Sequence, residues 1–361
     1  MSSNDIEMIS VTKAYGSHRA VNEVNLAIPA GEFVSILGPS GCGKTTTLNM
    51  IAGFAHPSSG DIRIRGKSQN GVPPEKRGIG MVFQNYALFP HMTVEENVAF
   101  GLKMKKRPIG EIRDAVKHAL RRVHLDGYGE RYPKELSGGQ QQRAALARAI
   151  APEPSLLLLD EPLSNLDLKL REAMRVELKD IQEQLAMTFV YVTHDQDEAM
   201  AMSDRIVVMQ NGVVAQCGRP ADIYDHPRSS FVADFIGKSN LLPIQEVQRS
   251  GKDWVVSVAT GLSLRAKTPD DTLADPPQYC CIRPEAVRLT MVESDASTSA
   301  NRLAGTLTRM VNLGAYFDCF VTLQDGTVLK SLVRSTRLPG LTSNQTVFLS
   351  IEREAVQLLP R

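Results

Sequence analysis

The chain has 361 residues, of which 42% are hydrophobic and 22% are charged, and its formal net charge at pH 7 is +1. At this length and composition we expect a globular protein of two or three domains. Neither the part before residue 240 nor the part after it carries a marked excess of Lys and Arg over Asp and Glu, so the composition argues against nucleic-acid binding.

Short apolar runs and the cysteine content indicate the compartment. A prominent apolar run, Leu156–Leu159, is far shorter than a helix that spans a bilayer. The sequence begins without the basic and then apolar pattern of a secretory signal. Its five cysteines lack the regular spacing of a disulfide framework, which suits reduced thiols. We therefore expect a cytoplasmic protein.

The first predicted elements are antiparallel strands between Ile6 and Ile28, where apolar and polar residues alternate. Tyr15 lies in a polar turn, Thr12–Gly16, shortly before a glycine-rich segment. Its ring could stack on a nucleotide base or pack within the protein. At this point the sequence leaves both roles open.

A phosphate-binding loop is predicted next, because the segment Gly38–Thr45 has the spacing G-x-x-x-x-G-K-T. The apolar run Phe33–Leu37 before it predicts a buried strand, and Thr45–Ala52 predicts a helix. The backbone N–H groups of such a turn and the helix N-terminus favour a bound phosphate. We expect Lys44 to reach the β- and γ-phosphates and Thr45 to help hold Mg²⁺, so the segment predicts ATP or GTP binding.

Strands are also predicted at Asp61–Ile64 and Ile79–Phe83. Gln84 follows the second of these, and the aromatic segment after it extends to His91. This pattern suggests a polar sensor joined to an exposed docking surface. From Val94 to Leu125 the apolar residues recur at helical spacing. They include Ile112, Ala115, Val116, Ala119, Leu120 and Val123.

A second pair of glycines occurs in the segment Leu136–Gln140, directly before a predicted helix from Gln141 to Ile150. Ser137 is a suitable N-cap for that helix. The helix N-terminus is a second candidate anion site. Two such sites in one chain suggest that each binds a different face of one nucleotide.

Two carboxylates, Asp160 and Glu161, end a continuously apolar strand that begins at Ser155. Such a strand is buried in a parallel sheet, and its carboxyl end opens onto the ligand crevice. Asp160 is therefore a candidate Mg²⁺ ligand. Glu161 is a candidate base that positions or deprotonates the attacking water.

The segment Ser164–Asp167 turns the chain into another amphipathic helix, and Thr188–Thr193 then predicts a strand. His194 follows that strand at the same sheet edge, where it could donate a hydrogen bond to a γ-phosphate oxygen. A hairpin is predicted around Asn211-Gly212. A short helix, Phe231–Ile236, is expected to end the first domain.

After about residue 240 the pattern changes to short strands, which predicts a small β-barrel. Ile282–Leu289 and Ile351–Leu358 are similar to each other and hint at a repeated unit. The adjacent Cys280 and Cys281 could be redox-active, but the pattern favours two small residues on opposite faces of one strand.

Together these segments resemble the ATPase subunit of an ATP-binding cassette (ABC) importer, over essentially the whole chain. The resemblance implies an α/β P-loop NTPase core with antiparallel β and helical subdomains. An all-β barrel of the OB or TOBE type would follow it. The implied boundaries are 1–238 for the nucleotide-binding domain, about 88–150 for its helical subdomain, and 239–361 for the regulatory barrel.

The resemblance also implies roles for individual residues. Tyr15 matches the adenine-stacking aromatic residue, Gln84 the Q-loop glutamine and His194 the switch histidine. Glu161, which ends the Walker B strand, would be the catalytic residue that acts on water, assisted by Gln84 and His194.

ATP and Mg²⁺ are the implied cofactors. Thr45, Gln84 and Asp160 would hold the metal ion. The other nucleotide contacts would come from the Walker A loop, the signature sequence and the D-loop (Ser164–Asp167). The residues concerned are Gly38, Pro39, Ser40, Gly41, Cys42, Gly43, Lys44, Thr45, Thr46, Ser137, Gly138, Gly139, Gln140 and Asp167.

The implied partners begin with a second copy of the chain, paired head to tail so that each ATP lies between one copy's Walker A loop and the other's signature. Two membrane-spanning permease subunits would dock near Gln84, and an extracytoplasmic solute-binding protein would act indirectly. The chain would lie peripherally on the cytoplasmic side of the inner membrane. No nucleic acid is expected.

The runs Asn85–His91 and Phe231–Gly237 most resemble polyamine importers of the spermidine and putrescine type. Importers of ferric iron, phosphonate, sulfate or sugar are alternatives. A DNA-repair ATPase would carry a long coiled coil between the Walker A loop and the signature, whereas only 92 residues separate Lys44 from Leu136. A non-transport ABC ATPase that regulates another process is a further alternative.

Overall fold

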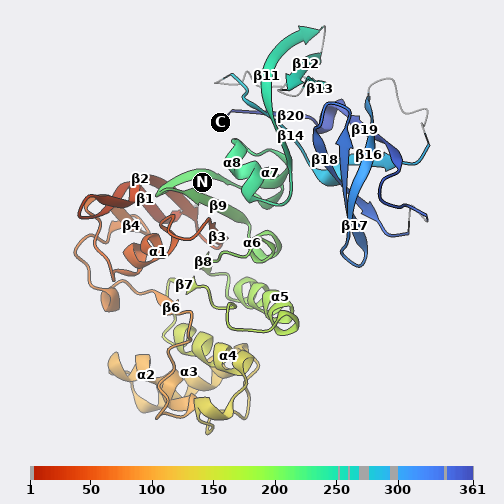
Figure 1. The fold of residues 1–361 in the computed structure, drawn as a ribbon. Helices are drawn as coiled ribbons and strands as arrows, with labels where there is room; N and C mark the ends of the chain where they lie inside the picture. The colour runs from red at the N-terminus through yellow and green to blue at the C-terminus, as the bar shows by residue number, and fades with distance from the viewer. Residues whose placement is uncertain are drawn as a thin grey trace. The chain divides into compact units, whose positions relative to one another are not determined.

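A computed structural model describes residues 4–250, 253–258, 261–267, 276–292, 300–336 and 340–360 of the chain. Contacts divide the chain into two compact units, Met1–Asp222 and Ile223–Arg361, which Figure 1 draws. The helix expected to end the first domain is α8 (Ser230–Phe235), and it groups with the second unit.

The N-terminal unit contains two sheets. One is antiparallel, with the order β2-β1-β4-β5. Its strands are β1 (Asn4–Tyr15), β2 (His18–Pro29), β4 (Ser59–Ile64) and β5 (Lys67–Ser68). The other has the order β10-β9-β3-β8-β7-β6, and only its β9–β10 pair is antiparallel. Its strands are β3 (Phe33–Leu37), β6 (Gly80–Val82), β7 (Leu156–Asp160), β8 (Thr188–Val192), β9 (Arg205–Gln210) and β10 (Val213–Gly218).

The central strands of the larger sheet are mostly apolar, as expected for strands with both faces buried. Leu156 and Leu158 pack into a core shared with α1 and the antiparallel sheet. Leu157 and Leu159 point to the opposite face and join a core built largely from α2 to α5. Because side chains alternate along a strand, one four-leucine run supplies both cores.

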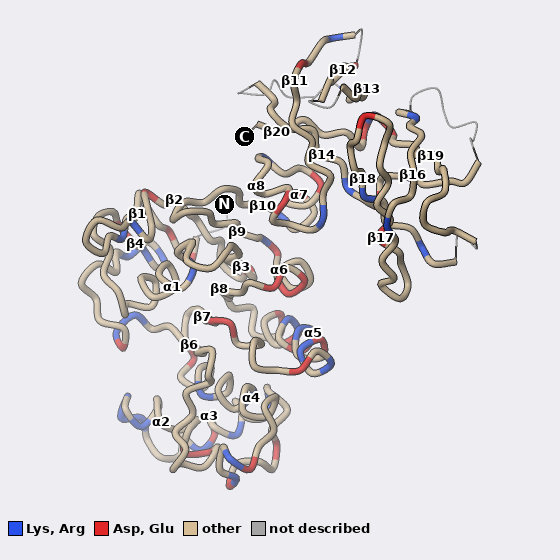
Figure 2. The backbone as a smooth tube through the Cα atoms, viewed as in Figure 1, with Lys and Arg blue, Asp and Glu red and all other residues tan. Residues whose placement is uncertain are grey.

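The helices of this unit are α1 (Lys44–Ala52), α2 (Val94–Met104), α3 (Ile109–Arg122), α4 (Gly138–Ile150), α5 (Leu168–Leu185) and α6 (Gln196–Met202), with single 3₁₀ turns at Pro74–Lys76 and Pro133–Glu135. α2, α3 and α4 pack on one another as a helical subdomain (Figure 1). The segment with helical spacing from Val94 to Leu125 is divided because Lys106 has a left-handed φ of 55° and Pro108 precedes α3. Acidic and basic residues are interspersed along α5 (Figure 2). None of the described helices combines the length and apolar character needed to cross a membrane.

Arg77 fixes the end of α1 farthest from the phosphate-binding loop. Its guanidinium donates to the carbonyls of Met50 and Ile51, both at 2.8 Å, and also to the carbonyls of Gln69 and Val72. The last carbonyls of a helix have no partner within the helix, so this buried arginine satisfies them. Burial lowers the pKa of Arg77.

The C-terminal unit begins around α7 (Pro220–Asp225) and α8, and its β-structure is two successive halves of the same design. The first half consists of β11 (Asn240–Ser250), β12 (Asp253–Val258), β13 (Ser263–Lys267), β14 (Tyr279–Ile282), a 3₁₀ turn at Pro284–Ala286 and β15 (Val287–Thr290). The second half consists of β16 (Ala300–Asn312), β17 (Tyr316–Leu323), β18 (Val328–Arg334), β19 (Thr346–Glu352), a 3₁₀ turn at Arg353–Ala355 and β20 (Gln357–Leu359).

The two halves exchange their last strands. The sheets have the orders β13-β12-β11-β14-β20 and β18-β17-β16-β19-β15. Each sheet therefore contains four strands of one half and the final strand of the other. The repeat detected in the sequence lies at this exchange, where Cys280 pairs with Leu358 and Val287 pairs with Ile351. The predicted repeated unit is confirmed.

A buried asparagine ties the first half to the second. Asn240 accepts a hydrogen bond from the Lys330 N–H at 2.7 Å and donates to the Lys330 carbonyl at 2.9 Å. It also donates to the Ile282 carbonyl at 3.2 Å. Its side chain thus extends a ladder of backbone hydrogen bonds from β11 to β18.

Asn301 makes the same set of bonds in the opposite direction. It accepts from the Arg265 N–H at 2.6 Å and donates to the Arg265 carbonyl at 3.0 Å and the Ile351 carbonyl at 3.2 Å. Ile351 is the repeat counterpart of Ile282. The pseudosymmetry therefore includes the side-chain contacts between the halves.

The adjacent cysteines lie on opposite faces of β14, as predicted. Cys280 belongs to the main core of the C-terminal unit, whereas Cys281 packs with Ala233 and Leu359. Burial raises the pKa of Cys281 to about 11 and that of Cys280 further still. Both thiols are thus poor nucleophiles at neutral pH.

We expect Asn301→Ala to destabilise the C-terminal unit by about 2–4 kcal/mol, because it leaves one buried and two part-buried backbone groups without their side-chain partner. Trp254, the single tryptophan of the chain, lies in β12, so its fluorescence during urea denaturation reports on this unit. Asn240→Ala should have a similar effect. The exposed Asn312 of β16 supplies the control, and an equal loss in Asn312→Ala would contradict the role of the buried ties.

Candidate active site

The phosphate-binding loop connects β3 to α1, as the sequence predicts. Gly43 has φ 106°, and a Cβ there would lie 2.5 Å from the Ala20 carbonyl oxygen. Lys44 Nζ donates to the carbonyls of Gly38 at 2.7 Å and Pro39 at 3.0 Å. The loop is therefore wrapped around the lysine ammonium.

The side chains of the loop point in different directions. Pro39, Ser40 and Thr45 are exposed, while Thr46 is half-buried. Cys42 points into the core beneath the loop, where burial raises the pKa of its thiol. Any contact of Cys42 with a phosphate would therefore come from its backbone N–H.

Asp160 lies beside the start of α1. Its Oδ1 accepts a hydrogen bond of 3.4 Å from Thr45 Oγ1. Burial, and next the charge of Glu161, raise the pKa of Asp160. Ionising Asp160 in this position therefore costs more free energy than in water, and a bound cation would reduce that cost.

Glu161 adopts a left-handed backbone conformation with φ 45°, uncommon for a residue other than glycine. Its N–H donates to the Val192 carbonyl of the neighbouring strand at 2.9 Å. Its Oε2 lies 3.5 Å from Gln84 Nε2 and 3.1 Å from His194 Nδ1. The structure therefore brings together the three residues predicted to be catalytic.

The turn after β7 is linked to the same group. Ser164 Oγ donates to the Glu161 carbonyl at 2.9 Å, and Asn165 Nδ2 donates to the Gln84 carbonyl at 2.9 Å. Asp167 is the N-cap of α5, since its Oδ1 accepts from the Leu170 N–H at 2.9 Å.

The signature segment lies at the N-terminus of α4. Ser137 and Gln140 form a reciprocal capping box, so the predicted N-cap is confirmed. A Cβ at Gly139 would lie 3.1 Å from Leu170 of α5, so glycine permits the close packing of the two helices. Among the described residues no hydrogen bond joins this segment to the phosphate-binding loop of the same chain.

Tyr15 is 56% exposed at the end of β1. Lys13 Nζ lies 4.9 Å from the ring centroid and donates to the His56 carbonyl at 2.7 Å. The ammonium covers one face of the ring as a cation–π pair. This arrangement favours the stacking role over packing within the protein.

The expectation that the aromatic segment after Gln84 is exposed is wrong for Tyr86, which is 6% exposed and belongs to the core. Leu88 and Phe89 are half-buried. Tyr86 and Ala87 have left-handed φ values of 61° and 47°. This turn directs Tyr86 inward, and periodicity in the sequence could not reveal it.

Two residues that the sequence did not single out hold this segment in place. Arg148 of α4 donates to the carbonyls of Tyr86 at 2.8 Å and Ala87 at 2.6 Å. The fully buried Asn97 accepts from the Phe89 N–H at 2.8 Å and donates to the Phe89 carbonyl at 3.1 Å. Each has mostly apolar neighbours on its own face of an amphipathic helix, which was the available signal, because a polar side chain on such a face needs hydrogen-bond partners.

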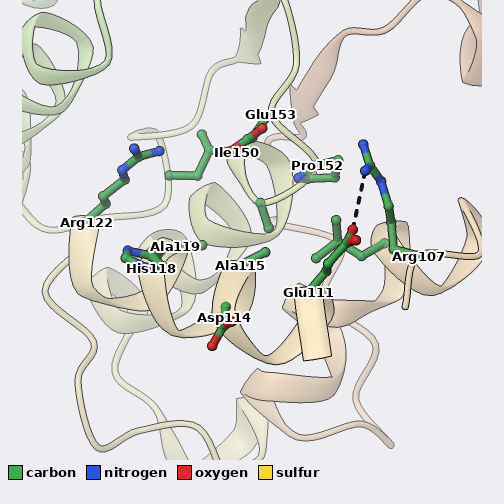
Figure 3. A pocket seen from close by; sticks show the side chains of 12 residues that line it. Arg107, Glu111, Asp114, Ala115, His118, Ala119, Arg122, Ile150, Pro152 and Glu153 are labelled. Carbon is green, nitrogen blue, oxygen red and sulfur yellow. Dashed lines mark hydrogen bonds and ion pairs between the residues drawn. The ribbon is translucent and has the colours of Figure 1, made fainter. Parts of the chain in front are cut away.

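A groove of about 480 Å³ lies on the helical subdomain, between α3 and the ends of α2 and α4 (Figure 3). Its apolar lining comes from Leu102, Ala115, Ala119, Ile150, Ala151 and Pro152. Its charged or titratable lining comes from Arg107, Glu111, Asp114, His118, Arg122 and Glu153. Figure 3 shows the ion pair of 3.4 Å between Arg107 and Glu111.

Comparison with protein families finds an ABC transporter domain over residues 21–164 and a TOBE domain over residues 280–359. A spermidine/putrescine import ATP-binding protein, PotA, from Thermobifida fusca is 49% identical over 98% of this chain and 93% of its own length. Its namesake from Nitratidesulfovibrio vulgaris is 46% identical over 90% of this chain and 88% of its own length. The chain belongs to the ABC transporter family.

Solved structures of ABC cassettes agree with this assignment. The dimeric ATP-binding cassette MJ0796, in a post-hydrolysis state bound to ADP and Pi, is 36% identical with a TM-score of 0.53 and covers 60% of this chain and 98% of that one. CbiO1 from Clostridium perfringens, part of the transporter complex CbiONQ, is 31% identical with a TM-score of 0.57 and covers 61% and 90%. The predicted ABC ATPase core and TOBE-type domain are confirmed.

We expect Asp160→Asn to stabilise the N-terminal unit of this ABC ATPase at pH 7 in the absence of Mg²⁺ and nucleotide. The folded pKa of Asp160 is raised, so its contribution to stability is present at low pH and is lost as the pH rises through that pKa. The advantage of the variant should therefore shrink as the pH is lowered.

Thermal denaturation followed by far-UV circular dichroism at several pH values measures this difference. Asp114→Asn, on the exposed side of α3, is the control and should leave the midpoint unchanged. A lower midpoint for Asp160→Asn at neutral pH would show that the carboxylate is not destabilising.

Proposed function

We propose that this chain hydrolyses ATP on the cytoplasmic side of the inner membrane to power the import of polyamines such as spermidine and putrescine. The spermidine/putrescine import ATP-binding proteins reported above match this chain over most of both lengths, including its TOBE domain. The observation that carries the chemistry is the Glu161 carboxylate, which lies within reach of both Gln84 and His194.

In this proposal Glu161 positions or deprotonates the water that attacks the γ-phosphate. His194 is held on Glu161 through Nδ1 at 3.1 Å, which leaves its other nitrogen for a phosphate oxygen. Lys44 exchanges its carbonyl contacts for the β- and γ-phosphates. Tyr15 stacks on adenine.

Side chains from the start of α1, the end of β7 and the segment after β6 fit a magnesium ion. Thr45, Asp160 and Gln84 offer hydroxyl, carboxylate and amide oxygens, the ligand type that Mg²⁺ prefers. Thr45 Oγ1 and Asp160 Oδ1 already lie 3.4 Å apart, and a cation would relieve the cost of ionising Asp160. When bound, Mg²⁺ neutralises charge on the phosphate oxygens.

A second copy of the chain would complete each site. The N-terminus of α4 carries Ser137, Gly138 and Gly139, yet its bonds within the chain are capping contacts and packing on α5. We propose that Ser137 to Gln140 contact the nucleotide held by the partner's phosphate-binding loop. Asp167, the N-cap of α5, contributes indirectly by fixing the position of the D-loop. The dimeric MJ0796 cassette with ADP and Pi supports this arrangement.

The permease subunits are proposed to dock in the groove of the helical subdomain. The groove has an apolar lining and a charged margin, which suits an amphipathic cytoplasmic segment. It also involves Ile150 at the end of α4, the helix whose Arg148 holds the segment after Gln84. Occupation of the groove would therefore act on the helix that leads to both the Q-loop and the signature.

Complementation tests the function. In cells that lack the gene, the wild-type chain should restore uptake of labelled spermidine, whereas Glu161→Gln should not. The purified variant should still bind ATP while hydrolysing it roughly 10²–10⁴ times more slowly, as expected for loss of a general base. Restored uptake of iron or maltose but not of spermidine would overturn the polyamine assignment. Wild-type hydrolysis by Glu161→Gln would remove Glu161 from its role.

Docking is tested by Ala115→Asp, which places a charge on the apolar lining of the groove. Permease assembly and spermidine uptake should fall, while the ATPase activity of the purified subunit is retained because the groove lies outside the phosphate site. The control is Lys117→Asp, which also introduces an aspartate in the same helix but at an exposed position, and it should leave assembly and uptake unchanged. If both variants assemble and transport normally, the permeases bind elsewhere.

A further inference from the structure

A small polar cavity of about 30 Å³ lies in the N-terminal unit, where the D-loop segment after Glu161 meets the segment around His194. Glu161 and Ser164 line it from the D-loop side, and His194 and Asp195 from the side of the switch histidine. Arg171, in the first turn of α5, lines the same cavity. None of the roles assigned above uses this arginine.

Arg171 contacts both sides. Its Nη2 donates to the Leu166 carbonyl in the D-loop at 3.0 Å. Its Nη1 donates to Asp195 Oδ2 at 3.5 Å, and its Nε lies 3.9 Å from Glu198 Oε1. A guanidinium can hold several acceptors at once in a fixed geometry, which an ammonium cannot do.

The acceptors of Arg171 on the second side fix the backbone around His194. Glu198 is 3% exposed and accepts from the hydroxyls of Tyr191 and Thr193, both at 2.6 Å. Thr193 Oγ1 in turn accepts from the Asp195 N–H at 2.9 Å. Thr193 is thus anchored to Glu198 and the Asp195 backbone to Thr193, so both sequence neighbours of His194 belong to the network beside Arg171.

We propose that Arg171 is a positioning residue that joins the D-loop to the switch-histidine segment, so that the place of Leu166 sets the orientation of His194 on Glu161. This inference rests on the proposed ATPase mechanism. In a head-to-tail dimer, the D-loop of one copy would lie against the partner. A shift of that D-loop would be passed through Arg171 to His194 of the same copy. The two ATP sites would be coupled through this side chain.

The test compares Arg171→Gln with Arg175→Gln. Arg175 lies one turn further along α5 and also pairs with Asp195, at 3.8 Å, but it has no described contact with Leu166. Arg171→Gln should lower kcat for ATP hydrolysis about 10–100-fold with KM for ATP unchanged, because displacing a catalytic group by about 1 Å can cost that much. Arg175→Gln should change kcat less than twofold. Arg171→Lys restores the charge without the fork and should recover only part of the rate.

A second measurement does not depend on turnover. In the protein labelled with ¹³C-histidine, the ring resonance of His194, assigned with His194→Gln, should move in Arg171→Gln and stay near its wild-type position in Arg175→Gln. An unmoved resonance, equal kcat losses in both variants, or a change confined to KM would overturn the proposal. Loss of the polyamine assignment alone would leave the His194 response intact.

Discussion

The candidate active site depends on four neighbouring parallel strands that end at one edge of the larger sheet. In the order β3, β8, β7 and β6, these ends carry the phosphate-binding loop, His194, the Asp160–Glu161 pair and Gln84. Because the strands are buried on both faces, their register is fixed by two cores at once. Residues that are far apart in the sequence are thereby held within hydrogen-bond reach of Glu161.

Helix α4 connects the parts of the site that the sheet edge does not reach. Its N-terminus carries the signature, and Ile150 near its other end lines the groove. Between them, Arg148 donates hydrogen bonds to the carbonyls of Tyr86 and Ala87. A rigid helix of thirteen residues would transmit a displacement at the groove to both of the other places. Mechanical coupling therefore needs no long chain of side-chain contacts.

Much of this could be predicted from the sequence, for a physical reason. β3 has the predicted bounds Phe33–Leu37, because a short apolar run followed by a glycine-rich turn allows few other structures. The inward turn of Tyr86 and the partners of Arg148 and Arg171 could not be predicted. They depend on left-handed backbone conformations and on carbonyls supplied by distant segments, and neither leaves a local pattern. The eight-residue repeat was visible, but the strand exchange around it was not, since pairing partners are a tertiary property.

That exchange has a consequence for the origin of the C-terminal unit. In each half the outer edge of β14 or β19 is paired with the last strand of the other half. A chain with a single half would leave this edge open, and unpaired edges bind other strands. Two identical copies could close it by trading their final strands. The present unit has the form of such a swapped homodimer fused into one polypeptide, so gene duplication would have made permanent an assembly that first had to find its partner in solution.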